Sequence, residues 1–93
     1  MDYAIQKPAF TGKQGQYLAF IHAYTLVMGR PPAEADMQRF FAVTPPSVHQ
    51  MVLTLERLGL ISRKPGAPRS IQLLIDPEIV PRLQPVISSV QRY

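Results

Sequence analysis

The segment from Thr44 to Gly59, TPPSVHQMVLTLERLG, constrains the fold more than any other, because it has the start, the end and the periodicity of a short amphipathic helix. Thr44 is a favourable N-cap, and Pro45 suits the first helical position, where a missing N–H costs nothing. Gly59 predicts the end of the helix, since glycine readily takes the left-handed conformation that follows many helices. One stripe is apolar and is expected to face a core: Val48, Met51, Val52, Leu55 and Leu58.

The opposite face of the predicted 45–58 helix carries short polar groups, with a positive charge toward its end. These residues are Ser47, His49, Gln50, Thr54 and Arg57. A helix with one buried stripe and one hydrogen-bonding face is suited to the major groove of DNA. Gln50 is a candidate for a bidentate contact to adenine. Thr44 at the cap either reaches a base edge or binds a phosphate through the helix N-terminus.

Two more helices are predicted before this one. The sequence Thr11-Gly12-Lys13-Gln14 has the form of a capping box and starts a helix over about 11–28, which Gly29 ends. Its apolar residues at helical spacing are Tyr17, Leu18, Phe20, Ile21, Tyr24, Val27 and Met28. The stiff connector Arg30-Pro31-Pro32 leads to a short helix over about 34–41.

The 34–41 helix presents Met37, Phe40 and Phe41 to the core, although Ala33 stands where a capping Ser or Thr is expected. Glu34 and Asp36 lie in its first turn, where acids favour the helix dipole, and we interpret both as structural. The very short link Ala42-Val43 then joins it to the 45–58 helix. Two short helices so joined, the second with a polar face, are typical of a helix-turn-helix.

A β-hairpin is predicted directly after the third helix. Leu60-Ile61 is a short apolar strand, residues 63–69 (RKPGAPR) are a basic turn with Pro-Gly punctuation, and residues 70–75 (SIQLLI) form a second strand that is largely apolar. Strand, basic loop and strand make a wing, for which Arg63, Lys64 and Arg69 are candidate phosphate contacts, as are Lys13 and Arg57. An ordinary solvated turn is the alternative interpretation of the same loop.

The charge distribution favours the same part of the chain. The 93 residues carry a formal net charge of +4 and have an estimated pI of 9.9. Residues 1–43 contribute +1, residues 44–70 contribute +3 and residues 71–93 contribute zero. The excess positive charge therefore lies in the predicted recognition helix and wing, where neutralising phosphates would make binding depend on salt.

Composition and length exclude several other classes of protein. The chain has no cysteine, so disulfides and thiolate metal sites are excluded, and no apolar run approaches the roughly 20 residues needed to span a bilayer. The N-terminal MDYAIQKPAF lacks the apolar region of a secretory signal, so we expect a cytoplasmic protein without membrane contact. Two histidines without partners and no Gly-rich phosphate loop predict no catalytic site, metal site or cofactor.

The predicted organisation is an N-terminal arm (1–10), a winged helix-turn-helix domain (11–75) and a C-terminal tail (76–93). In the arm, Tyr3, Ile5 and Phe10 are candidates for packing on the body. In the tail, Asp76-Pro77-Glu78 caps a short helix, and residues 86–92 have an apolar face suited to one or two more helical turns. The tail either packs back on the domain or pairs with a second copy, and the sequence does not decide between them.

The segment from about Thr11 to Ile75 resembles the N-terminal DNA-binding domain of the LexA repressor family. The matching pieces are KQGQYLAFIHAYTLVMGRPP, TPPSVHQMVLTLERLGLI and KPGAPRSIQLL, of which the Gly-Arg-Pro-Pro connector and the wing are the most specific. The resemblance implies a mainly α fold with a small β-hairpin, that is, a three-helix winged helix-turn-helix. It also implies double-stranded DNA as the partner. The base-reading positions that it implies are Thr44, Pro46, Ser47, His49 and Gln50.

The chain departs from this family in two respects. The family normally joins such a domain to a C-terminal Ser-Lys self-cleaving and dimerising domain, for which 93 residues leave no room, so neither self-cleavage nor that dimer contact is carried over. Pro46 stands where the family often has a polar side chain, so the operator need not be the same. Because the chain has so few basic residues, we expect it to bind DNA as a dimer or at tandem sites. The alternative function is a winged-helix protein-interaction module, favoured by an exposed Leu53 and the apolar tail from Val86 to Val90.

Overall fold

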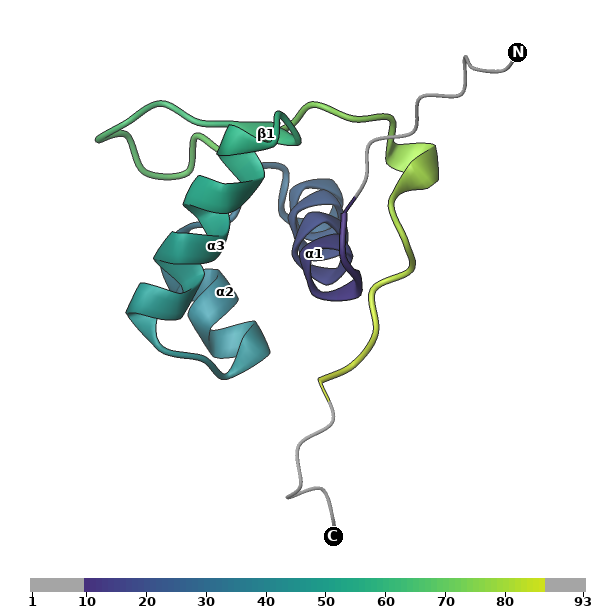
Figure 1. The fold of residues 1–93 in the computed structure, drawn as a ribbon, viewed down its shortest axis with the longest axis horizontal. Coiled ribbons are helices and arrows are strands. Elements are labelled where there is room, and N and C mark those ends of the chain that lie inside the picture. Colours follow the sequence, from purple (N-terminus) through teal and green to yellow (C-terminus); the bar gives the residue numbers. More distant parts are fainter. Residues whose placement is uncertain (1–9, 87–93) are drawn as a thin grey trace, which may run out of the picture.

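The computed structural model describes residues 10–86 and places three helices, a two-stranded hairpin and a short 3-10 helix in chain order (Figure 1). The helices are α1 (Gly12–Met28), α2 (Glu34–Phe41) and α3 (Pro45–Arg57). The strands are β1 (Ile61–Ser62) and β2 (Gln72–Leu73), and the 3-10 helix is η1 (Pro77–Ile79). The predicted fold class, a mainly α winged helix-turn-helix, is therefore confirmed.

The predicted capping box starts α1. The Thr11 N–H donates to Gln14 Oε1 (2.9 Å), and the Gln14 N–H donates to Thr11 Oγ1 (3.1 Å). The helix ends at Gly29, whose φ of 75° is left-handed. Both ends lie at the predicted residues, because reciprocal capping and a left-handed stop are local properties of the sequence.

The link between α2 and α3 is as tight as predicted and bends at Ala42, which takes a left-handed φ of 55°. Thr44 caps α3, since its Oγ1 accepts from the Ser47 N–H (3.4 Å). At the other end the Gly59 N–H donates to the Glu56 carbonyl and the Leu60 N–H to the Leu55 carbonyl, both at 3.0 Å. This pair of bonds around a left-handed glycine is the Schellman motif, which turns the chain from α3 into β1.

The core is formed by the faces of α1, α2 and α3 that meet beneath the hairpin. Its fully buried apolar side chains include Tyr17, Leu18, Ile21, Met37, Val48, Val52, Leu55, Leu60 and Ile61. Aromatic rings join α1 to α2, with Tyr17 stacked on Phe41 at a centroid distance of 4.1 Å and Phe20 tilted against Phe40 at 4.8 Å. Phe40 and Phe41 pack against this core from its edge.

Four side chains differ from their predicted burial. Leu58, Val27 and Met28 continue their apolar stripes in sequence, yet they are 49%, 80% and 51% exposed. Each stands at the last turn of its helix or just beyond it. Leu53, predicted as exposed, is half-buried. Periodicity identifies the face of a helix, but the length of the partner decides how much of that face is covered.

The hairpin is antiparallel, with Ile61 opposite Leu73 and Ser62 opposite Gln72. Its second strand is shorter than the predicted 70–75 segment. The apolar run within it alternates in burial, since Ile71 is buried while Leu74 is 56% exposed. A two-stranded sheet on a helical body covers one face only, so every second side chain points outward.

The C-terminal segment packs back on α1, which is one of the two alternatives left open by the sequence. Both polar atoms of the Gln16 side chain bond to this segment. Nε2 donates to the Arg82 carbonyl (3.0 Å), and Oε1 accepts from the Gln84 N–H (2.8 Å). Pro81 and Phe10 lie so close to Gly15 that an added Cβ would come within 2.9 Å of the Pro81 ring. Figure 1 shows this segment running beside α1.

The predicted short helix at Asp76-Pro77-Glu78 is confirmed as η1, with the Glu78 N–H donating to Asp76 Oδ1 (2.9 Å). Of the predicted arm contacts, Phe10 packs against the core, while Tyr3 and Ile5 lie outside the described residues. The predicted helical turn over 86–92 also falls outside them, except for Val86, which is not helical.

Candidate nucleic-acid interface

The outer face of α3 is open to solvent, because its opposite stripe is buried against α1, α2 and the hairpin. Six of the seven side chains predicted to contact DNA from this helix and its cap are exposed: Thr44, Pro46, Ser47, His49, Gln50 and Arg57. Thr54, the seventh, is half-buried. In Figure 1 α3 lies at the edge of the molecule, and the hairpin loop extends past its C-terminal end.

A shallow hollow separates α3 from the first turns of α1. Ser47, Gln50 and Thr54 line it from α3, and Lys13 and Gln14 line it from α1. The cap of α1 therefore brings a positive side chain and a helix N-terminus beside the polar face of α3. Both features attract phosphate oxygens.

His49 lies apart from this hollow, on the side of α3 that faces α2. Its Nδ1 is 3.2 Å from Glu34 Oε2, and the imidazole is about half exposed. This contact links Glu34, at the start of α2, to His49 near the start of α3. An imidazole engaged in this way has one ring nitrogen left for another partner.

The predicted phosphate contacts at the base of the wing differ in whether they already have a partner. Arg63 Nε donates to Glu56 Oε1 at 3.0 Å, so this arginine is turned back onto α3. Lys64 and Arg57, by contrast, are exposed, and within residues 10–86 their side chains form no hydrogen bond or ion pair. The readily available positive charge therefore comes from Lys64 and Arg57, with Arg63 partly neutralised by Glu56.

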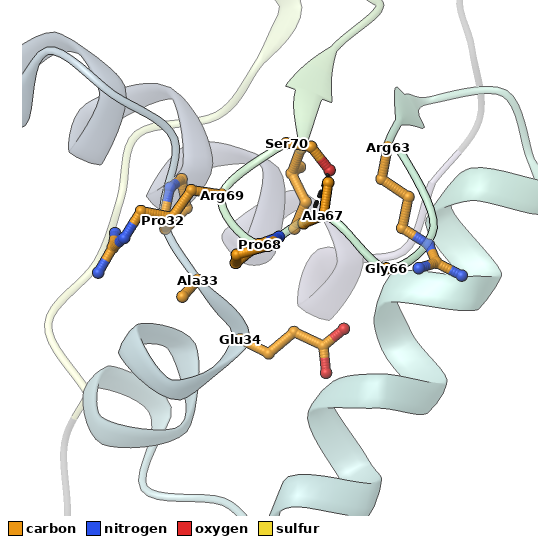
Figure 2. A pocket seen from close by; sticks show the side chains of 10 residues that line it. Pro32, Ala33, Glu34, Arg63, Gly66, Ala67, Pro68, Arg69 and Ser70 are labelled. Carbon is orange, nitrogen blue, oxygen red and sulfur yellow. Dashed lines mark hydrogen bonds between the residues drawn. The ribbon is translucent and has the colours of Figure 1, made fainter.

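Arg69 is placed differently from the prediction, because its guanidinium points into the body. Nη1 is within hydrogen-bond distance of Asp36 Oδ2 (3.1 Å), Tyr24 Oη (3.1 Å) and the Pro31 carbonyl (3.2 Å). A pocket of about 330 Å³ lies between the wing and the start of α2. Figure 2 shows Arg63 and Arg69 on opposite sides of this pocket, directed away from each other.

Asp36 is the partner that fixes Arg69. Its carboxylate accepts from the Ala33 N–H (2.8 Å), which is the half of a capping box that the third helical residue supplies, and it also pairs with Arg39. The Ala33 N–H, followed by the charge of Arg69, lowers the pKa of Asp36 below its ordinary value in spite of burial. Hydrogen bonding to Tyr24 is the largest of the contacts that raise the pKa of Arg69. The structural interpretation of the first-turn acids therefore agrees with these contacts.

Sequence reasoning missed Ser70, which fastens the wing loop. Its Oγ accepts from the Lys64 N–H (2.8 Å) and lies within hydrogen-bond distance of the Ala67 carbonyl (2.9 Å). Glu56 and Tyr24 were missed as well. A serine that follows a Pro-Gly turn is a detectable signal for loop closure, but the partners of Glu56 and Tyr24 come from distant parts of the chain.

The described residues offer little for other chemistry. Between residues 10 and 86, no three His, Asp or Glu side chains gather in a way that would hold a metal ion. In the same range, no helix is both long enough and apolar enough to cross a membrane.

Three helices, an antiparallel wing and a polar, solvent-facing α3 define the class: this is a winged helix-turn-helix protein. The family model described as LexA DNA binding domain matches residues 7–70. The chain therefore belongs to the LexA DNA-binding domain family, as the resemblance in its sequence indicated.

Relatives with curated descriptions agree with this assignment. The chain is similar to the LexA repressor of Thermosipho africanus, with 40% identity over 75% of this chain and 35% of that protein. It is also similar to the LexA repressor of Thermotoga neapolitana, with 35% identity over 68% of this chain and 32% of the relative. A third relative, the LexA repressor of Bartonella quintana, is 33% identical over 73% of this chain and 29% of that protein. The matched part thus spans about a third of each relative.

Proposed function

We propose that this protein binds double-stranded DNA in a sequence-specific way and regulates transcription, with α3 in the major groove and the wing on the backbone. The observation that carries the proposal is the solvent-facing polar side of α3, flanked by Lys13 on α1 and by Lys64 on the wing. Membership of a DNA-binding domain family supports it. Cytoplasmic location and a dimeric state belong to the same proposal.

The contacts divide by position. Ser47 and Gln50, with Thr44 and Pro46 beside them, form the base-reading group, because they occupy the exposed first turns of α3. Thr54 and His49 flank this group, and His49 has its second ring nitrogen available for a base while Nδ1 contacts Glu34. Lys13, Arg57, Arg63 and Lys64 are the phosphate contacts. Arg69, with its guanidinium turned into the body, is a supporting residue in this scheme.

Salt dependence tests the proposal. With four positive side chains on phosphates, the plot of log affinity against log salt should have a slope of about −3 to −4. The affinity for a labelled random duplex should then fall roughly 100-fold between about 50 and about 200 mM salt. Fluorescence anisotropy measures it. Absence of binding at the lower salt concentration would overturn direct DNA recognition.

Neutralising Glu56 should strengthen binding. In Glu56→Gln the Arg63 guanidinium loses the carboxylate that holds it and becomes available to a phosphate, and one negative charge leaves the interface. We expect about threefold tighter binding at low salt, a gain that shrinks as salt rises. The matched control is Glu78→Gln on η1, which changes the net charge equally outside the proposed interface. Equal effects of both variants would show that Arg63 is not released onto DNA.

A winged-helix module for protein–protein interaction is the second candidate. Leu53 no longer supports it, since this side chain is half-buried. The exposed Leu26, Val27 and Met28 in the last turn of α1 favour it instead, because they form a run of apolar side chains on the surface. Binding through such a surface would persist as salt rises, so the anisotropy experiment separates the two functions.

A further inference from the structure

The position of Arg69 differs from that of the other basic residues of the wing. It lies near the start of β2, at the point where the loop returns to the body, and its backbone takes a left-handed φ of 55°. A non-glycine residue in this region is strained and keeps the conformation only where its surroundings enforce it. Here the three contacts to Asp36, Tyr24 and the Pro31 carbonyl supply that restraint.

These three partners belong to the helix-turn-helix body and not to the wing. Tyr24 is on α1, Pro31 is in the connector, and Asp36 is in the first turn of α2. The Asp36 side chain is only 9% exposed, and the Arg69 side chain is 33% exposed. The Arg69 guanidinium also lies 5.9 Å from the centre of the Tyr24 ring. A single side chain therefore ties the returning arm of the wing to two helices.

The outgoing arm has its own attachment. Arg63 pairs with Glu56 on α3, and the Lys64 N–H donates to the Ser70 hydroxyl next to Arg69. The loop that carries Lys64 is thus held at both of its ends, on α3 by Arg63 and on α2 by Arg69. In Figure 2 these two arginines leave the wing in opposite directions, one on either side of the pocket.

We infer that Arg69 is a positioning residue for DNA binding: by anchoring the wing to Asp36 and Tyr24, it holds Lys64 at the height above α3 at which both can contact one duplex. The inference rests on the proposed function. It makes Lys64 the phosphate contact that Arg69 positions, and it removes Arg69 from the residues that touch DNA.

A double-mutant cycle of Lys64→Ala and Arg69→Gln in DNA affinity tests it. If Arg69 acts by placing Lys64, each single variant should weaken binding about tenfold, and Lys64→Ala should cost less than about twofold in the Arg69→Gln background. The magnitude of the salt slope should fall by about 0.9 in each single variant and no further in the double variant. A direct phosphate contact by Arg69 instead gives additive losses of affinity and of slope.

A second variant, Arg69→Lys, separates the anchoring role of Arg69 from a direct phosphate contact in a protein that keeps the positive charge. A lysine keeps the charge and suits a phosphate, but its side chain is one bond shorter, so its ammonium does not reach the position of Nη1, the atom that makes all three contacts to Asp36, Tyr24 and the carbonyl. Arg69→Lys should therefore bind as weakly as Arg69→Gln, at a temperature where circular dichroism shows all variants folded. Additive losses, or recovery of affinity by Arg69→Lys, overturn the inference and leave the proposed function standing. Absence of binding by the unaltered protein overturns the proposed function itself.

Discussion

Replacing Ser47 and Gln50 together by alanine should weaken binding to a selected operator by about 100-fold while changing the affinity for random duplex only slightly. Both side chains are exposed in the first turns of α3 and line the hollow beside α1. A bidentate contact to a base contributes about 1–3 kcal/mol of discrimination, and a lost hydroxyl contact adds to it. The ratio of operator to random affinity is the quantity to measure, after an operator has been selected from a random pool.

The fold should tolerate this change. The N-cap bond of α3, in which the Ser47 backbone N–H donates to Thr44 Oγ1, remains in the alanine variant, and only the exposed contact from the Thr44 hydroxyl to Ser47 Oγ (3.1 Å) is lost. Within residues 10–86 the Gln50 side chain forms no hydrogen bond. Lys64→Ala is the contrasting control, because loss of a phosphate contact weakens operator and random duplex by the same factor. An unchanged ratio in the Ser47/Gln50 variant would show that these residues do not read the sequence.

The elements of this fold could be predicted because their signals are local. Thr11 with Gln14, Thr44 with Pro45, and Gly29 and Gly59 fix the ends of α1 and α3 within a few residues of sequence. The hairpin followed from a Pro-Gly turn between two short apolar runs. No knowledge of distant contacts was needed for any of these predictions.

Predictions that depend on distant partners were less accurate. The sequence of a basic loop does not show whether an arginine side chain faces solvent or the protein. Arg69 hydrogen-bonds to Asp36, which lies 33 residues earlier in the chain, so local sequence gives no signal for this contact. The docking of the tail on Gln16 spans 66 or more positions and could not be decided beforehand. Leu58 continues the apolar stripe of α3 in sequence, but it is the C-cap residue, where the chain leaves the helix, and it is exposed. The sequence therefore indicates which segments could carry a candidate site, but it does not give the direction of the charged side chains.

The difference matters for the proposed function, because it changes which charges are available. Of the eleven side chains predicted to contact DNA, Arg63, Arg69 and His49 already have partners on Glu56, Asp36 and Glu34. Each of these three side chains of the surface is thus paired with an acid. The orientation of the wing relative to α3 depends on two of the pairs, Arg63 with Glu56 and Arg69 with Asp36. Asp36 has the most contacts of the three acids.

Asp36→Asn should lower the free energy of unfolding by about 2 kcal/mol near neutral pH. The amide retains the shape of the side chain, but it replaces two charge-assisted contacts, to Arg69 and Arg39, by neutral ones and weakens the cap on Ala33. For a domain of this size that loss lowers the midpoint of thermal unfolding by roughly 8–15 °C. Glu34→Gln in the same helical turn is the matched control and should change stability by less than about 0.5 kcal/mol, because its pair with His49 is exposed.

The dependence on pH identifies the origin of this stability. The folded protein holds the pKa of Asp36 below its ordinary value, so folding favours the ionised form. The stability that Asp36 contributes is therefore fully present above the unfolded pKa of about 3.9 and is lost as pH falls through the lower, folded pKa. Urea unfolding of the protein and of Asp36→Asn should show a constant difference between about pH 5 and 8 that narrows below about pH 4. A difference that stays constant in acid would mean that the stability lost in Asp36→Asn does not come from the charge of the carboxylate.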